Sequence, residues 1–103
     1  MNFEAAPKET ETHTSWDEAK LYCAFLEVDG KNDWRLPTNE ELKKIYQSKN
    51  DFTNDYYWSS TEDNDNNVGL AIGKLAWFQD MSNGYVYSGY KGNRAYIRAV
   101  RYI

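Results

Sequence analysis

The spacing of apolar residues predicts a helix near the start of the chain. Apolar side chains recur at helical spacing at Trp16, Ala19, Tyr22, Cys23 and Leu26. Ser15 and Glu18 have the form of a capping box, in which each side chain accepts from the other residue's amide. Gly30 suits the left-handed conformation that ends many helices. The pattern therefore predicts a first helix over about residues 16–28.

A second helix is predicted over about residues 39–47. Thr38 and Glu41 form another capping box just after a proline. The apolar stripe of this helix consists of Leu42, Ile45 and Tyr46. This second start signal is the clearer of the two.

Strands follow the helices. Aromatic and β-branched residues cluster in four runs, 56–60, 75–78, 85–87 and 96–101. Asn83-Gly84 lies between the second and third runs and predicts a hairpin with a type I′ turn. Two helices followed by these strands predict an α+β fold, in which two helices pack on a small twisted antiparallel sheet with long loops.

Residues 1–14 form a polar lead-in with alternating acids and threonines, which predicts a short edge strand at best. Residues 15–103 are then predicted to form a single domain. A chain of 103 residues has room for one core, and an aromatic content of 17% supplies it. The rings predicted to lie in this core are Trp34, Trp58, Trp77 and Tyr57, with Leu36 beside them, and a sugar-stacking platform is the alternative.

Charge and cysteine usage narrow the class of partner. Twelve basic against 16 acidic residues give a net charge of -4, which lacks the positive field that nucleic-acid binding needs. No apolar run is long enough to span a bilayer, and the first residues lack the features of a signal peptide. Cys23 is the single cysteine. These features predict a cytoplasmic protein with no nucleic-acid or membrane partner, or an extracellular one if the chain is part of a longer adhesin.

Five motifs, in this order along the chain, carry a resemblance to a known family. They lie at residues 15–19 with 22–23, 34–38 with 41–42, 57–62, 82–84 and 97–101. The chain resembles the C-terminal domain of the Legionella collagen-like protein, a bacterial and phage family. The resemblance implies a C-type lectin-like fold used for binding, in domains that sit at the ends of adhesins, lipoproteins and phage proteins. Many members place a second cysteine in the final strand, where this chain has Ala99, so Cys23 lacks that partner. This departure favours the cytoplasm, a phage-infected host cell or a virion over an oxidising extracellular setting.

The sequence gives little support to metal binding or catalysis. The acidic loop at 63–67 offers oxygen ligands, but an EF-hand beginning at Asp63 would place Val68 where glycine is needed and Lys74 where glutamate is needed. The tripeptides of calcium-dependent lectins are also absent. His13 is the single histidine, and Cys23 lies on an apolar stripe, so no nucleophile and base pair is visible. We predict no metal, no cofactor and no enzymatic activity.

Three arginines invite an ion-binding interpretation. Arg35, Arg98 and Arg101 could hold an anionic ligand, but arginines paired with carboxylates are the more usual finding. The carboxylates proposed as partners are Glu18, Glu41 and Glu62.

The segment from residue 79 to 96 mixes tyrosine with serine, glycine and asparagine, the composition of antibody paratopes. The predicted ligand-binding residues are Tyr85, Tyr87, Tyr90, Lys91 and Asn93, with Asp63, Asn64 and Asp65 from the acidic loop, which extends from Glu62 to Asn67. Alternatively, these tyrosines cover a half-exposed hairpin.

The sequence therefore predicts a non-enzymatic domain that recognises a macromolecule, with a protein ligand favoured over a glycan. A phage product that acts on a host protein is one form of this hypothesis. The alternatives are a glycan-binding surface adhesin or lipoprotein domain, and a structural subunit of a larger assembly that forms homo-oligomers.

Overall fold

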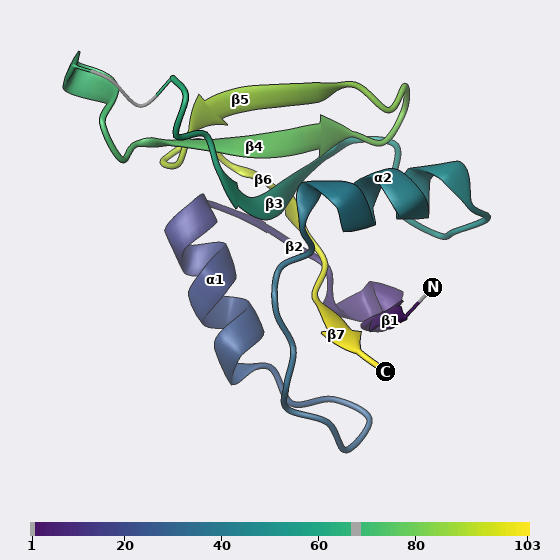
Figure 1. Cartoon of the computed structure of the whole chain (residues 1–103). Helices are drawn as coiled ribbons and strands as arrows, with labels where there is room; N and C mark the ends of the chain where they lie inside the picture. Colours follow the sequence, from purple (N-terminus) through teal and green to yellow (C-terminus); the bar gives the residue numbers. More distant parts are fainter. Residues whose placement is uncertain (1, 67–68) are drawn as a thin grey trace.

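The computed structural model describes residues 2–66 and 69–103, and within them two α-helices accompany seven short strands (Figure 1). The elements in chain order are β1 (Phe3–Ala5), η1 (Lys8–Thr10), β2 (Thr12–Thr14), α1 (Trp16–Phe25), α2 (Asn39–Gln47), β3 (Tyr56–Glu62), η2 (Gly69–Ala71), β4 (Leu75–Asp80), β5 (Val86–Tyr90), β6 (Ala95–Ile97) and β7 (Val100–Tyr102). This arrangement confirms the predicted α+β class. No helix in the described ranges has the length and apolar character needed to cross a membrane.

The strands form two sheets. The larger has five strands in the order β2-β6-β3-β4-β5, and the smaller pairs β1 with β7, which brings the two ends of the chain together (Figure 1). The prediction of a wholly antiparallel sheet is wrong at one place, because β6 returns to lie between β2 and β3 and runs parallel to β3. Nothing local in the sequence of β6 specifies that insertion.

The first 14 residues take part in the fold more than the sequence predicted. They contain two strands, where one edge strand at most was expected, and each pairs with a strand from the end of the chain. Phe3 and Ala6 are buried in the two cores. The polar alternation hid this role because strand pairing, not local burial, fixes the segment.

Helix α2 has the predicted bounds, and its capping box is present. The Glu41 amide donates to the Thr38 hydroxyl at 3.1 Å, and the Thr38 amide donates to the Glu41 carboxylate at 2.9 Å. These two bonds satisfy amide groups that a helix start otherwise leaves unpaired.

Helix α1 begins at Trp16 as predicted but ends at Phe25, three residues early. Ser15 makes no side-chain cap, and Glu18 instead accepts from the Thr14 hydroxyl at 2.7 Å. Gly30 does have a positive φ of 73°, but it lies in a turn that joins Val28 to Lys31 and does not cap the helix.

The predicted hairpin between β4 and β5 exists, but its turn is not of type I′. Gly84 has a positive φ of 81°, whereas Asn83 does not have the positive φ that this turn requires at both positions. The Asp80 amide donates to the Tyr85 carbonyl at 2.8 Å, so the connection is longer than two residues. The last predicted strand is also divided, because Arg98 and Ala99 interrupt it between β6 and β7.

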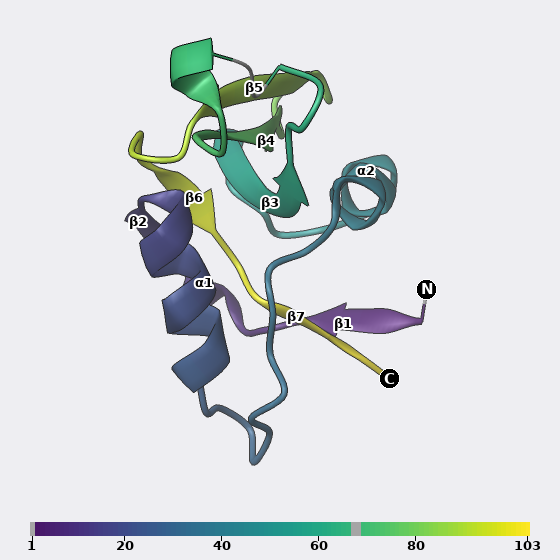
Figure 2. The ribbon, with the colours of Figure 1, turned by 60° about the vertical axis from the view of Figure 1, so that its left-hand side comes forward.

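The two helices cover opposite faces of the larger sheet (Figure 2). On one face, Trp16, Ala19 and Cys23 of α1 belong to a buried cluster that also includes Trp34, Leu36, Trp58, Ala76, Ala95, Ile97 and Ala99. On the other face, Leu42 and Ile45 of α2 belong to a cluster that also includes Tyr57, Met81 and Val100. Of the residues predicted to form the core, Trp34, Leu36, Tyr57 and Trp58 are buried, whereas Trp77 is half-buried. Because α1 lies over β6 and β3, it leaves the β4 and β5 part of its face open (Figure 2).

Candidate binding face

Three aromatic rings gather on the part of the sheet that α1 leaves uncovered. Phe78 on β4 pairs with Tyr87 on β5, and their ring centroids lie 5.7 Å apart. Tyr56 on β3 meets both edge-on, at 5.3 Å from Phe78 and 6.2 Å from Tyr87. Tyr56 and Tyr87 remain 45% and 39% exposed. Edge-to-face packing holds these rings in place while leaving their outer surfaces free for a ligand.

A pocket of about 300 Å³ lies beside these rings. Its lining consists of Tyr56, Trp58, Phe78, Asn93, Arg94 and Ala95. Arg94 is exposed and donates to the His13 carbonyl at 2.7 Å, and within the described ranges it forms no ion pair with a carboxylate. Its charge is therefore available to a ligand. We call Tyr56, Phe78, Tyr87, Asn93 and Arg94 the open aromatic face.

Gly89 shapes this face by having no side chain. A Cβ atom at this position would lie 2.9 Å from Cε1 of Phe78 and 3.8 Å from Nδ2 of Asn93. A separation below 3.0 Å requires one of the groups to move, so glycine lets the Phe78 ring lie against β5.

The structure brings two of the predicted ligand-binding residues, Tyr87 and Asn93, to the open aromatic face and places the other tyrosines elsewhere. Tyr85 precedes β5 at the turn and is 65% exposed. Tyr90 is 57% exposed, but it lies three positions after Tyr87 in the same strand and therefore points to the opposite face. The predicted tyrosine patch is thus divided between two faces of the hairpin.

Lys91, another predicted ligand-binding residue, packs against its own fold. Its ammonium lies 4.4 Å from the centre of the Trp16 ring and donates to the Gly73 carbonyl at 2.8 Å. It also lies 3.4 Å from Glu62, and the Trp16 amide donates to the Lys91 carbonyl. With 13% of its side chain exposed, Lys91 ties the end of β5 to the start of α1.

The acidic loop contains one buried and two exposed residues among its three predicted ligand contacts. Asp63 is fully buried, and its carboxylate accepts from the Asn66 amide and side chain at 3.2 and 2.8 Å. Burial raises the pKa of Asp63, but hydrogen bonds from Ser88 and Asn66 outweigh it and lower the pKa below its usual value. The side chain of Asp63, one of the predicted ligand contacts, therefore lies buried, and its oxygens accept hydrogen bonds within the loop. Asn64 and Asp65 are exposed, as a ligand contact requires.

Asn67 and Val68, which figured in the calcium argument, lie outside the described residues. Within the described ranges, no group of three or more His, Cys, Asp or Glu residues is arranged to hold a metal ion.

Sequence reasoning missed three members of the open aromatic face: Tyr56, Phe78 and Arg94. Tyr56 and Phe78 were recognised as strand residues, but the register that pairs β3 with β4 brings them together. That register is interrupted by a bulge between Trp58 and Glu62, which no local signal announces. Alternation could have placed Tyr56 on the same face as the buried Trp58.

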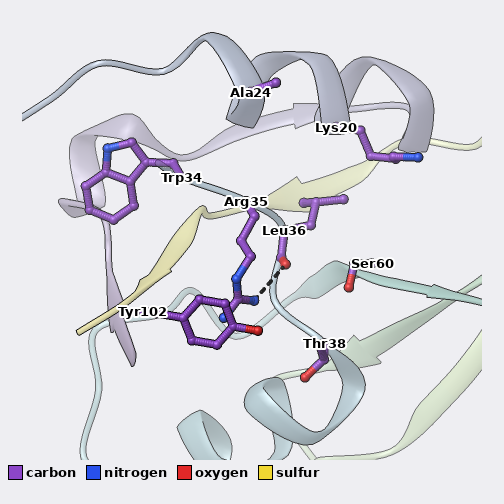
Figure 3. Close-up of a pocket in the computed structure, with 8 residues that line it drawn as sticks. All are labelled: Lys20, Ala24, Trp34, Arg35, Leu36, Thr38, Ser60 and Tyr102. Atoms are coloured by element: carbon purple, nitrogen blue, oxygen red, sulfur yellow. Dashed lines mark hydrogen bonds between the residues drawn. The ribbon is translucent and has the colours of Figure 1, made fainter. Parts of the chain in front are cut away.

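A second pocket, of about 390 Å³, lies between α1, the start of α2 and β7 (Figure 3). Arg35 crosses it with its guanidinium 4.0 Å from the centre of the Tyr102 ring. Its two terminal nitrogens donate to the Glu41 carboxylate at 2.6 and 2.7 Å, which raises the pKa of Arg35. Because Glu41 already neutralises this guanidinium, the pocket offers no free arginine charge. We therefore assign Arg35 a structural role and place the candidate site on the open aromatic face.

The other two arginines are also paired with carboxylates, as predicted. Arg98 is buried, donates to the Ala6 carbonyl at 2.7 Å and pairs with Asp51 at 2.5 Å. Arg101 pairs with Glu4 and Asp33. The hydrogen bond from Lys31, followed by that from Arg101, lowers the pKa of Glu4, and the bond from Arg101 lowers the pKa of Asp33.

Of the three carboxylates proposed as partners for these arginines, only Glu41 is confirmed. Glu18 bonds to Thr14, and Glu62 lies beside Lys91. The remaining partners come from segments distant in the sequence, which no local pattern identifies.

Cys23 is a buried free thiol. Burial raises its pKa to about 12, so the thiol stays protonated at neutral pH. Ala99, at the position of the second family cysteine, belongs to the same buried cluster. A thiol in this environment is suited to packing.

Comparisons with known proteins agree with this fold. A family model described as the Lcl C-terminal domain matches residues 3–101. Among solved structures, a chain of a complex between a von Willebrand factor A1 domain mutant and botrocetin is similar, with a TM-score of 0.59 and 11% identity over 96% of both chains. At that identity the likeness shows the fold alone. No curated protein is similar enough in sequence to count as a match. Because the family model spans nearly the whole chain, the chain belongs to the Lcl C-terminal domain family.

Proposed function

We propose that this chain is a non-enzymatic, C-type lectin-like binding domain that recognises a protein through the open aromatic face. The observation that carries the proposal is the group of packed, partly exposed rings of Tyr56, Phe78 and Tyr87 beside a pocket lined by Arg94. This arginine forms no ion pair with a carboxylate among residues 2–66 and 69–103. Tyrosine and arginine are among the residues that contribute most binding energy at protein interfaces.

The rings are held before a ligand arrives. Tyr56 packs edge-on against both neighbours, with interplanar angles of 81° and 89°. Tyrosine has two side-chain torsions, so little conformational entropy remains to be lost on binding. Asn93 adds hydrogen-bonding capacity at the rim of the pocket, which completes the mixed aromatic and polar character of a protein-binding surface.

A protein is the favoured ligand because the face is apolar at its centre and carries the positive charge of Arg94, which no carboxylate of the described residues neutralises. The net charge of -4 on the whole chain disfavours nucleic acid. Carbohydrate recognition also uses aromatic rings, so a glycan ligand is the outcome that the experiment has to distinguish.

The experiment is an affinity capture from the lysate of the native host, under reducing conditions that keep Cys23 a free thiol. The test variant is Tyr56→Ala/Tyr87→Ala. The matched control is Phe25→Ala, which removes a ring that is 82% exposed on α1, away from the face. Circular dichroism of each variant checks that the fold is retained.

We expect one host protein that is captured by the parent and by Phe25→Ala and is lost with the double variant. Equal capture by all three proteins would contradict the assignment of the face. Binding on a glycan array that a free sugar displaces, with no protein captured, would support the glycan alternative instead.

A further inference from the structure

Strand β5 lies at an edge of the five-stranded sheet, next to β4 (Figure 1). The Asp80 amide donates to the Tyr85 carbonyl, and the Lys91 amide donates to the Lys74 carbonyl. In an antiparallel pair, residues that bond to the neighbour alternate with residues whose N–H and C=O point away. Tyr87 and Gly89 therefore bond inward to β4.

The outward groups on β5 belong to Val86, Ser88 and Tyr90. Within residues 2–66 and 69–103, the amide and carbonyl of Val86 and Ser88 and the amide of Tyr90 have no hydrogen-bond partner. The Tyr90 carbonyl accepts from the Asn93 amide at 2.9 Å. The edge thus presents a row of donors and acceptors at strand spacing.

This edge lacks the features that usually protect a sheet from further pairing. Between Val86 and Tyr90 the strand contains no proline, no charged residue and no bulge in its pairing with β4. The opposite edge differs, because β2 has three residues and its Thr14 carbonyl accepts from the Trp58 indole at 3.1 Å.

We propose that β5 docks an extended segment of the partner protein, which adds to the sheet as a sixth strand. This inference rests on the proposed function and names the form of its ligand. An extended backbone is the occupant that matches alternating N–H and C=O groups along the whole strand. Backbone bonds of this kind provide affinity, and the side chains on either side provide selectivity.

The chemistry of the docked segment follows from the two faces of β5. Side chains of an added strand alternate between the faces. On one face they lie beside Tyr87 and the open aromatic face, and on the other they lie beside Val86 and Tyr90. The segment therefore carries aromatic or β-branched side chains on both sides, which pair well with such neighbours across a ladder. It has no proline where an amide must donate to β5.

The probe for this inference is a displayed library of random linear peptides of 12 residues, selected on the parent protein. Enriched peptides are then measured against Ser88→Pro and against Tyr56→Ala/Tyr87→Ala, with Phe25→Ala as the control. Proline at position 88 removes an outward amide and no backbone bond between β5 and β4, so the variant is expected to fold. It also removes the Ser88 hydroxyl that hydrogen-bonds Asp63, so Ser88→Ala, which loses the hydroxyl but keeps the amide, is measured beside it.

Two measurements do not depend on that variant. Synthetic peptides with N-methyl groups at alternate residues remove amides from one edge of the bound strand. Amide exchange by NMR reports whether Val86, Ser88 and Tyr90 exchange fast in the free protein and become protected in the complex.

We expect the enriched peptides to bind Ser88→Pro about tenfold more weakly than they bind the parent. We also expect a peptide that is N-methylated in one of the two alternate registers to bind the parent about tenfold more weakly than the unmethylated peptide does. The amides of Val86, Ser88 and Tyr90 gain protection on binding. The edge inference is overturned if those amides are already slow in the free protein, if peptides bind Ser88→Pro and the parent equally without protecting them, or if no peptide is enriched. Peptides that depend on Tyr56 and Tyr87 but not on the edge would leave the proposed function standing, whereas peptides that depend on the edge alone would overturn the assignment of the face.

Discussion

Replacement of Trp58 tests the core that supports the open aromatic face. Its indole is 1% exposed and lies edge-on to Phe78, with ring centroids 5.6 Å apart. The indole N–H donates to the Thr14 carbonyl on β2 at 3.1 Å. Trp58 therefore joins the edge strand β2, the middle of the sheet and the floor of the candidate pocket.

The expected cost of Trp58→Ala follows from these contacts. Removal of a buried tryptophan ring costs about 3–5 kcal/mol, because transfer energy is lost and a cavity remains. The Thr14 carbonyl also loses its donor, which adds about 1 kcal/mol. The sum, about 4–6 kcal/mol, is a large part of the roughly 5–15 kcal/mol that a domain of this kind has in total. Trp58→Phe keeps a ring and is expected to lose about 1–3 kcal/mol, from the lost hydrogen bond and from the space left by the smaller ring.

Urea unfolding followed by circular dichroism measures these free energies, with Trp77→Ala as the control because Trp77 is half-buried. We expect the order of loss to be Trp58→Ala, then Trp77→Ala and Trp58→Phe. A loss below about 1 kcal/mol for Trp58→Ala, with an unchanged dependence on urea, would refute the reasoning.

Three further predictions concern charge, an unpaired amide and a close approach. The hydrogen bond from Arg35 lowers the pKa of Glu41 below its unfolded value of 4.5. The ionised Glu41 carboxylate therefore stabilises the fold above pH 4.5, and this stabilisation is lost as the pH falls through the lowered pKa of the folded state. Glu41→Gln, which keeps a capping side chain, should make Tm depend less on pH between 6 and 3 than in the parent; an identical dependence would count against the pair. Gln79 is 1% exposed, and neither of its side-chain amide atoms has a hydrogen-bond partner in the described residues. Gln79→Met should therefore raise the free energy of unfolding by about 1–2 kcal/mol, and a lower free energy of unfolding measured by chemical denaturation would contradict this. Gly89→Ala places a methyl 2.9 Å from Cε1 of Phe78 and should lower stability by about 1–3 kcal/mol, whereas an unchanged or higher Tm would refute the close approach.

Local signals predicted the elements that local contacts hold. Helix α2 has the expected bounds because its first turn is fixed by Thr38 and Glu41, three residues apart. Helix α1 ends early because the chain after Phe25 leaves the helix for a short bridge between Val28 and Lys31. The helical spacing of apolar residues continues to Leu26, so it could not show that the chain leaves the helix after Phe25.

Pairing between distant segments was beyond the sequence. The division of the last strand follows from Arg98, whose side chain turns inward to the Ala6 carbonyl near the other end of the chain. The parallel pairing of β6 with β3 likewise depends on where β2 lies. These contacts are set by the whole fold, so a reading of neighbouring residues along one chain does not contain them.

The two exposed tyrosines of β5 also lie where local sequence could not place them. The sequence correctly identified a strand rich in exposed tyrosines, but Tyr87 and Tyr90 are three positions apart and therefore lie on opposite faces of β5. A rigid ligand resting on one face contacts one of them. A strand added along the edge of β5 places side chains on both faces, so it contacts both tyrosines at once. The composition that suggested a single binding surface is thus consistent with the unpaired edge, because the edge is where the two faces meet.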